Sequence, residues 1–110
     1  MNKYLFESLD QIQKEFGPSF YERIDIPFAN NNKKNNLKKF IINNIPNDIC
    51  NYFVKNVSMT DGIKIRLENN FWILFRFSGT EPLLRLYCEA PSKDLLDKAL
   101  KWSKQFINNE

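Results

Sequence analysis

The hydrophobic residues near the start of the chain recur at the spacing of an amphipathic helix. Between residues 2 and 16, one helical face collects Leu5, Leu9, Ile12 and Phe16. Gly17-Pro18 follows and predicts a firm end to that helix. A helix of this kind belongs either to the core of the domain that follows or to the tail of a preceding domain.

The same helical period predicts two further helices. A short helix from Leu37 to Ile45 collects Leu37, Phe40, Ile41 and Ile45 on one face, and Pro46 ends it. The last helix opens at Pro91-Ser92, where Ser92 can cap its start. It carries a broad apolar stripe from Leu95 to Ile107, which predicts packing against a sheet.

Alternation of apolar and polar residues predicts strands between these helices. The expected strands are Phe20–Phe28, Asn51–Met59, Ile63–Leu67, Phe71–Phe77 and a last strand with Leu84, Leu86 and Cys88 on one side. Thr60-Asp61-Gly62 and Asn69-Asn70 have turn composition, because Gly and Asn tolerate left-handed backbone.

The run from Asn30 to Asn36 is of low complexity, and we expect it to be an exposed loop. Lys33 and Lys34 offer one functional interpretation, a basic patch for nucleic acid or a polyanion. A solvated linker is the favoured interpretation, because no aromatic residue interleaves with the lysines.

The element order is strand, helix, four strands and helix. Adjacent strands joined by short turns imply an α+β fold, with a mainly antiparallel sheet of four to five strands and two helices on one face. One domain is expected at 110 residues, since the chain is 43% hydrophobic and 15% aromatic and can build a core.

Composition excludes several functions. The chain has no His, which excludes a Ser-His-Asp triad and His metal ligands in it. Cys50 and Cys88 form no CxxC pair, so free thiols are expected. The net charge of +3 is weak evidence for nucleic acid, and we expect no nucleic-acid partner. With no apolar run of membrane-spanning length and no signal peptide, the sequence predicts a cytoplasmic protein without a membrane partner.

Seven residues, Arg76 to Pro82, interrupt the last two predicted strands with the chemistry of an oxyanion site. Arg76 offers a planar fork of donors that matches phosphate. Ser78 and Thr80 offer hydroxyls, and Gly79 can turn with positive φ so that backbone N–H groups converge on an anion. Ser-Gly-Thr is also ordinary hairpin composition, so these residues alone leave both interpretations open.

The stretch RFSGTEPLLRLYCEA resembles the phosphate-binding loop and following strand of the C-terminal domain of the α-D-phosphohexomutases, the family of phosphoglucomutase, phosphomannomutase and phosphoglucosamine mutase. Every defined position of the motif Arg-x-Ser-Gly-Thr-Glu-Pro is met. The resemblance implies a sheet likened to that of the TATA-binding protein, which by itself does not imply DNA binding. It favours residues 1–19 as the tail of a preceding domain and residues 20–110 as the phosphate-binding domain.

The resemblance also implies the chemistry. These enzymes move a phosphoryl group between positions 1 and 6 of a hexose through a bisphosphate such as glucose 1,6-bisphosphate. A phosphoserine and Mg²⁺ on earlier domains carry out the transfer. The C-terminal loop holds the phosphate that is not being transferred, which assigns Arg76, Ser78, Gly79 and Thr80 to phosphate binding. No residue of this chain is then catalytic, and no metal is bound by it.

Two neighbours of the loop need separate interpretation. Glu81 would repel a phosphate, so a role in bracing the loop is expected for it. Arg85 is either a second phosphate ligand or, as we prefer, the partner of Glu68 or Glu89 in a cross-strand pair.

The chain lacks the family's phosphorylated serine motif, its metal loop and its sugar-recognition loop, so we do not expect this chain to turn over substrate alone. Its partners would be a phosphohexose, bound through its phosphate, and the missing domains of the same enzyme. A stand-alone binding module for a phosphorylated ligand or RNA is the alternative. The first hypothesis predicts an exposed apolar surface where other domains dock.

Overall fold

The computed structural model describes residues 19–109. The helix predicted between residues 2 and 16 lies outside the described residues, and so does the tail to which it was assigned. Within residues 19–109, no helix combines the length and the apolar composition that crossing a bilayer requires.

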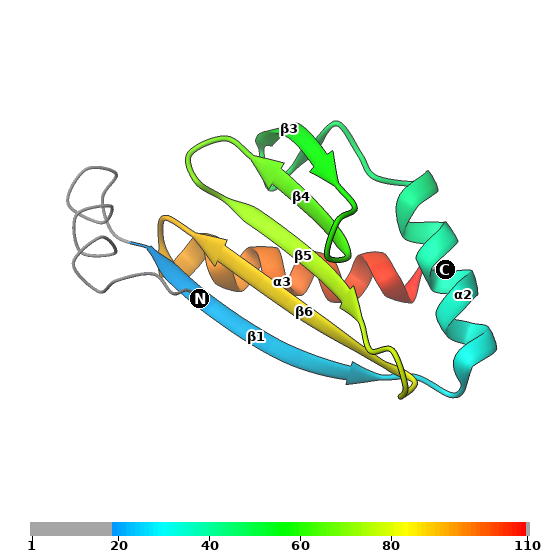
Figure 1. Cartoon of the computed structure of the whole chain (residues 1–110). Helices are drawn as coiled ribbons and strands as arrows, with labels where there is room; N and C mark the ends of the chain where they lie inside the picture. The colour runs from blue at the N-terminus through cyan, green and yellow to red at the C-terminus, as the bar shows by residue number, and fades with distance from the viewer. Residues whose placement is uncertain (1–18, 110) are drawn as a thin grey trace.

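Six antiparallel strands form one sheet in the spatial order β1-β6-β5-β4-β3-β2 (Figure 1). Their bounds are β1 Phe20–Pro27, β2 Asp48–Ile49, β3 Tyr52–Ser58, β4 Ile63–Leu67, β5 Trp72–Phe77 and β6 Leu83–Ala90. The order places β1, the first strand, beside β6, the last, so the two ends of the domain pair with each other.

The predicted α+β class is confirmed, with one strand more than expected. The addition is the two-residue strand β2, which pairs with Tyr52 and Phe53 at the start of β3. Cys50 and Asn51 between them have φ of 53° and 71°, so the chain reverses in two residues. The sequence pattern concealed this turn, because cysteine rarely adopts that conformation.

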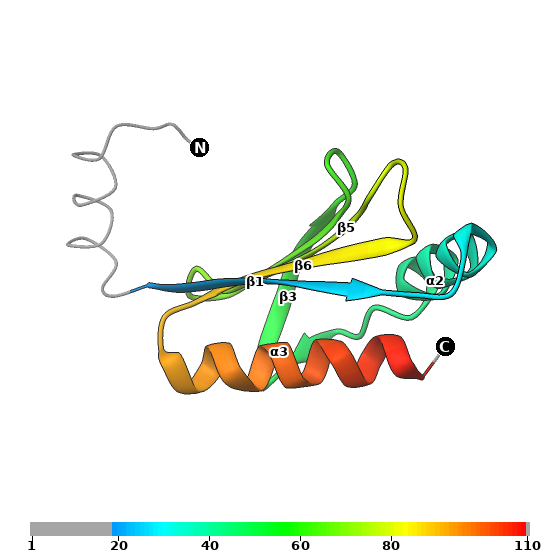
Figure 2. The ribbon, with the colours of Figure 1, turned by 90° about the horizontal axis from the view of Figure 1, so that it is seen from below.

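Helix α3, Lys93–Asn108, runs along one face of the sheet, and within residues 19–109 no helix covers the opposite face (Figure 2). The cap predicted at Ser92 is confirmed, since its Oγ accepts a hydrogen bond from the N–H of Leu95 at 3.1 Å. The predicted apolar stripe of α3 packs onto inward-facing residues of the central strands, among them Phe75, Ile73 and Leu86, which are fully buried.

Helix α2, Asn31–Asn43, corrects the prediction for the Asn/Lys run. Residues 30–36 are not a loop, because Asn30 caps a helix that starts there: its side chain accepts from the N–H of Lys33 at 3.0 Å. Buried Leu37 and Ile41 anchor this helix in the core, which outweighs the weak helix propensity of asparagine.

Both predicted turns in the second half of the chain are confirmed. Asn69 and Asn70 have φ of 61° and 62°, as a tight hairpin requires. Gly62 has φ of 128° between β3 and β4. The alternation predicted for β4 is confirmed as well, since Ile63, Ile65 and Leu67 are buried.

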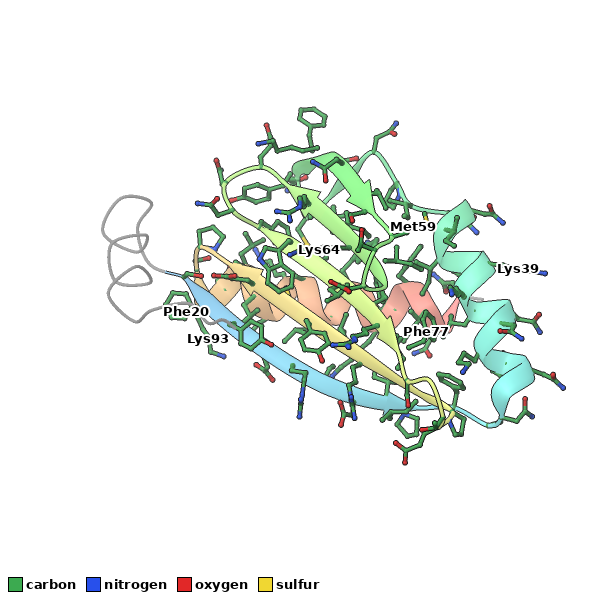
Figure 3. All side chains as sticks on the ribbon, in the orientation of Figure 1. Phe20, Lys39, Met59, Lys64, Phe77 and Lys93 are labelled. Atoms are coloured by element: carbon green, nitrogen blue, oxygen red, sulfur yellow. The ribbon has the colours of Figure 1, made fainter. Side chains whose placement is uncertain are left out.

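An apolar hollow of about 590 Å³ lies between the end of α2 and the outer strand β3. Four large exposed apolar side chains line it: Ile42, Phe53, Val57 and Met59. Met59, labelled in Figure 3, is 55% exposed. Large apolar side chains gathered at one exposed place are typical of a surface that meets a partner.

Candidate functional site

The candidate site is the loop between β5 and β6, and three backbone hydrogen bonds hold it in place. At its base, the N–H of Ser78 donates to the carbonyl of Leu83 at 2.9 Å, and the N–H of Leu83 donates to Glu81 at 2.7 Å. The N–H of Phe28, just after β1, donates to the carbonyl of Pro82 at 2.9 Å. The loop is therefore tied to the neighbouring edge of the sheet as well as to its own strands.

Ser78 organises the interior of the loop with its hydroxyl. Its Oγ accepts from the N–H of Glu81 at 3.2 Å and, more weakly, from the N–H of Thr80 at 3.4 Å. A serine hydroxyl that takes up the next backbone donors closes a turn in place of a backbone carbonyl. Gly79 and Thr80 lie at the exposed tip.

The positive φ expected at Gly79 is wrong. Gly62 has the only positive φ among the described glycines, and a Cβ added at Gly79 would meet no atom within 4 Å. The reversal is made by the Ser78 side chain over several residues, so no left-handed residue is needed. Within residues 19–109 the N–H of Gly79 donates to no protein group, which leaves this donor free for a ligand.

Arg76 projects from β5 directly before this loop. Its neighbours in sequence, Phe75 and Phe77, turn toward the core, so the exposed Arg76 side chain lies on the uncovered face of the sheet. Arg85 of β6 is its direct cross-strand partner. The register therefore places these two residues opposite each other on the same face of the sheet, where like charges repel.

The partner predicted for Arg85 is wrong. Its Nε lies 3.8 Å from Oδ1 of Asp25, its register partner on β1, and not near Glu68 or Glu89. Glu68 accepts from the N–H of Phe53 at 3.0 Å, and Glu89 accepts from Nε1 of Trp72 at 2.9 Å. At 3.8 Å the pair with Asp25 is loose, and the Arg85 Nε has no hydrogen-bond partner in the described part of the chain.

Glu81 braces the loop, as expected, but through its backbone. Its N–H donates to Ser78 and its carbonyl accepts from Leu83. Glu81 is exposed, and no ion pair within residues 19–109 involves its carboxylate. The carboxylate can therefore turn into solvent, away from a bound anion.

Two features near the loop were not predicted from the sequence. Nζ of Lys34, in the first turn of α2, donates to the carbonyl of Ser78 at 3.1 Å. A Cβ added at Gly62 would lie 2.7 Å from the Phe75 carbonyl oxygen and 3.2 Å from the Cα of Arg76, so the turn at Gly62 presses on the strand that carries Arg76. Extending the helical period of Leu37 and Ile41 backward by three residues would have reached Lys34.

The uncovered face of the sheet carries more basic than acidic side chains, its acids including Asp25 and Glu89. Cross-strand register places five basic side chains on it: Arg23, Lys64, Arg66, Arg76 and Arg85. Lys64, labelled in Figure 3, lies 4.3 Å from the centroid of the Trp72 ring. Burial, and then the nearby charge of Arg66, lowers the pKa of Lys64.

The described residues do not fit a magnesium site. Between residues 19 and 109, no three His, Cys, Asp or Glu side chains are grouped so that they could hold a metal ion. Both cysteines are free thiols, as expected, and Cys88 is buried. What this arrangement can do chemically is bind and orient an oxyanion.

Comparison with known proteins adds the family. The model for the C-terminal domain of phosphoglucomutase/phosphomannomutase matches residues 22–101, which is most of the chain and includes the whole loop. The chain belongs to this family. It is a phosphohexomutase C-terminal domain by sequence and by its antiparallel α+β fold.

Individual relatives of this phosphohexomutase domain are much longer proteins. It is 36% identical to the phosphoglucosamine mutase of Methanocaldococcus jannaschii over 97% of this chain and 22% of that protein. It is 32% identical to the phosphoglucosamine mutase of Methanococcus maripaludis strain S2 over 83% of this chain and 22% of that protein. With a probable phosphoglucosamine mutase of Methanosphaera stadtmanae it shares 39% identity over 51% of this chain and 12% of that protein. The chain thus spans about a fifth of these relatives or less.

Proposed function

We propose that the β5–β6 loop of this domain binds the non-transferred phosphate of a phosphohexose. The whole enzyme would move a phosphoryl group between positions 1 and 6 of the sugar through its bisphosphate. Because the relatives named above are phosphoglucosamine mutases, we propose a glucosamine phosphate as its substrate. The proposed cytoplasmic location rests on the sequence alone.

The position of the exposed Arg76, directly before the loop on β5, carries the proposal. The Arg76 guanidinium offers paired donors to an oxyanion, and the loop that follows adds the Ser78 and Thr80 hydroxyls and the free N–H of Gly79. None of these groups needs to change protonation state. Their contribution would be to hold the substrate in place and to balance its charge while chemistry happens at the other end.

The rest of the enzyme is the proposed partner of this domain. The chain spans about a fifth of the M. jannaschii relative, so the phosphoserine and Mg²⁺ implied by family membership would lie in parts outside this chain. The apolar hollow between α2 and β3 supports docking of such a part, because it exposes Phe53, Val57 and Met59 together.

An NMR titration of the 110-residue chain with glucose 1,6-bisphosphate tests the proposal. We expect binding near 1 mM, about 4 kcal/mol, with shifts centred on Arg76 and residues 78–80. Arg76→Ala should weaken binding about tenfold or more, because it removes a charge-assisted pair of donors. Glucose without phosphate should cause no shifts.

Arg23→Ala is the matched control. Arg23 lies on the same face of the sheet and is exposed, but it belongs to β1 and sits opposite Tyr87, away from the loop. It should change the affinity less than about twofold, as expected for a solvent-screened charge. Equal losses in the two variants, or no response of the unaltered chain to the bisphosphate, would rule out the loop as a specific phosphate site.

A further inference from the structure

Lys34 connects helix α2 to the candidate phosphate loop. Its Nζ donates to the Ser78 carbonyl at 3.1 Å, a contact between residues 44 positions apart. Among the lysines of α2, Lys34 is half-buried, whereas Lys33, Lys38 and Lys39 are exposed. Figure 3 shows Lys39 pointing away from the sheet, to the outside of α2. One lysine of this basic run is therefore set apart by its position.

The fold of the first turn of α2 explains this position. Lys34 precedes the buried Leu37 by three residues and the buried Ile41 by seven, so all three lie on the inward face of the helix. The hydrogen bond from Phe28 to Pro82 holds the start of α2 beside the loop, because the helix begins three residues after Phe28. Core packing thus directs this side chain at Ser78.

All three polar groups of Ser78 are then engaged. Its N–H binds Leu83, its hydroxyl accepts from Thr80 and Glu81, and its carbonyl accepts from Lys34. Leu83, Thr80 and Glu81 belong to the loop or its base, and Lys34 alone of these four partners comes from another part of the fold. An ammonium group has three donors, so this contact leaves donors that can reach an oxyanion at the loop.

The charge of Lys34 acts in the same direction. It places a positive charge at the Ser78 carbonyl, two residues after Arg76, and the first turn of α2 has no acidic residue to offset it. Asn30 caps the helix with a neutral amide, so the positive end of the helix dipole also remains.

We propose that Lys34 is a further residue of the phosphate site: it positions the loop through the Ser78 carbonyl and adds positive charge where the phosphate would bind. This inference rests on the proposed function. The motif Arg-x-Ser-Gly-Thr-Glu-Pro begins more than forty positions after Lys34 and does not contain it. The substrate affinity of this loop would therefore depend on a helix outside the motif.

Three variants of the 110-residue chain test the inference, with glucose 1,6-bisphosphate as the probe. Lys34→Met keeps the length of the stem and removes charge and donors, and it should weaken binding about fivefold. Lys34→Arg, which can still donate to Ser78, should restore the affinity to within about twofold. Lys38→Met removes an exposed charge from the same helix and should change the affinity less than about twofold.

A second readout needs no ligand. The Ser78 carbonyl ¹³C shift and the amide shifts of residues 79–81 should move in Lys34→Met and stay in place in Lys38→Met. If Lys34→Met does not fold, Lys34→Gln, which removes the charge and keeps a neutral donor, replaces it in the affinity readout. Equal affinities of Lys34→Met and Lys38→Met, or failure of Lys34→Arg to restore binding, would overturn the inference. If the unaltered chain does not bind the bisphosphate, the proposed function is wrong. If the Ser78 shifts also stay in place in Lys34→Met, the positioning role is wrong as well.

Discussion

Replacing Gly62 with alanine is expected to destabilise the domain by on the order of 3 kcal/mol. The φ of 128° at Gly62 lies where side-chain-bearing residues are strained. The new Cβ would also lie 2.7 Å from the carbonyl oxygen of Phe75, which is backbone of a central strand and cannot rotate away. The turn must therefore move, or β5 must shift. Urea unfolding would show the change as a lower midpoint.

The same substitution should weaken phosphate binding in whatever fraction stays folded. The second atom in the way is the Cα of Arg76, at 3.2 Å, so a shift of the strand would displace the guanidinium. A bisphosphate titration of Gly62→Ala below its unfolding midpoint would measure this effect.

Gly79→Ala is the control for stability. The Gly79 backbone has no positive φ, and an added Cβ would meet no atom within 4 Å. Its unfolding free energy should therefore stay within about 0.5 kcal/mol of the unaltered protein. If both alanine variants lost similar stability, the contact between the Gly62 turn and β5 would not be a structural constraint.

A second large effect is expected at alkaline pH, from Cys88. Burial, followed by the charges of Cys50, Glu89 and Glu22, raises the pKa of this thiol from 9.0 to about 12. The folded protein then keeps the proton while the unfolded chain releases it above pH 9. The stabilisation is fully present below pH 9 and is lost as the pH rises toward 12. At a pH of about 11 the loss should reach about 2–3 kcal/mol.

Cys88→Ala isolates the pH-dependent contribution of the Cys88 thiol to stability. The smaller side chain lowers stability by a roughly constant amount, and the unfolding free energies of the two proteins should converge between pH 9 and 11. Tyr21, whose pKa is also raised by burial, titrates in both proteins and cancels in the comparison. Urea unfolding at several pH values would measure it, and parallel pH profiles would show that Cys88 ionises as readily in the folded protein as in the unfolded chain.

Local pattern predicted most of the elements, and it failed where a helix cap, core packing or an unusual backbone angle decided the structure. The strands and α3 follow from alternation and from an unbroken apolar stripe. The run from Asn30 to Asn36 was assigned to a loop because it is of low complexity. The cap at Asn30 and the buried Leu37 decide otherwise. Strand β2 was missed because its turn uses positive φ at Cys50.

The sequence by itself determined the family, the α+β class and the four motif residues proposed to bind phosphate, because each depends on residues close together in the chain. Only the tertiary structure decided which distant groups surround them. The pairing of Arg76 with Arg85 and of Arg85 with Asp25 depends on strand register, and the contact of Lys34 with Ser78 depends on how α2 packs. Hydrophobic periodicity states which face of an element is buried, but it does not state which residue of another element lies opposite, since that is set by the packing of the whole core.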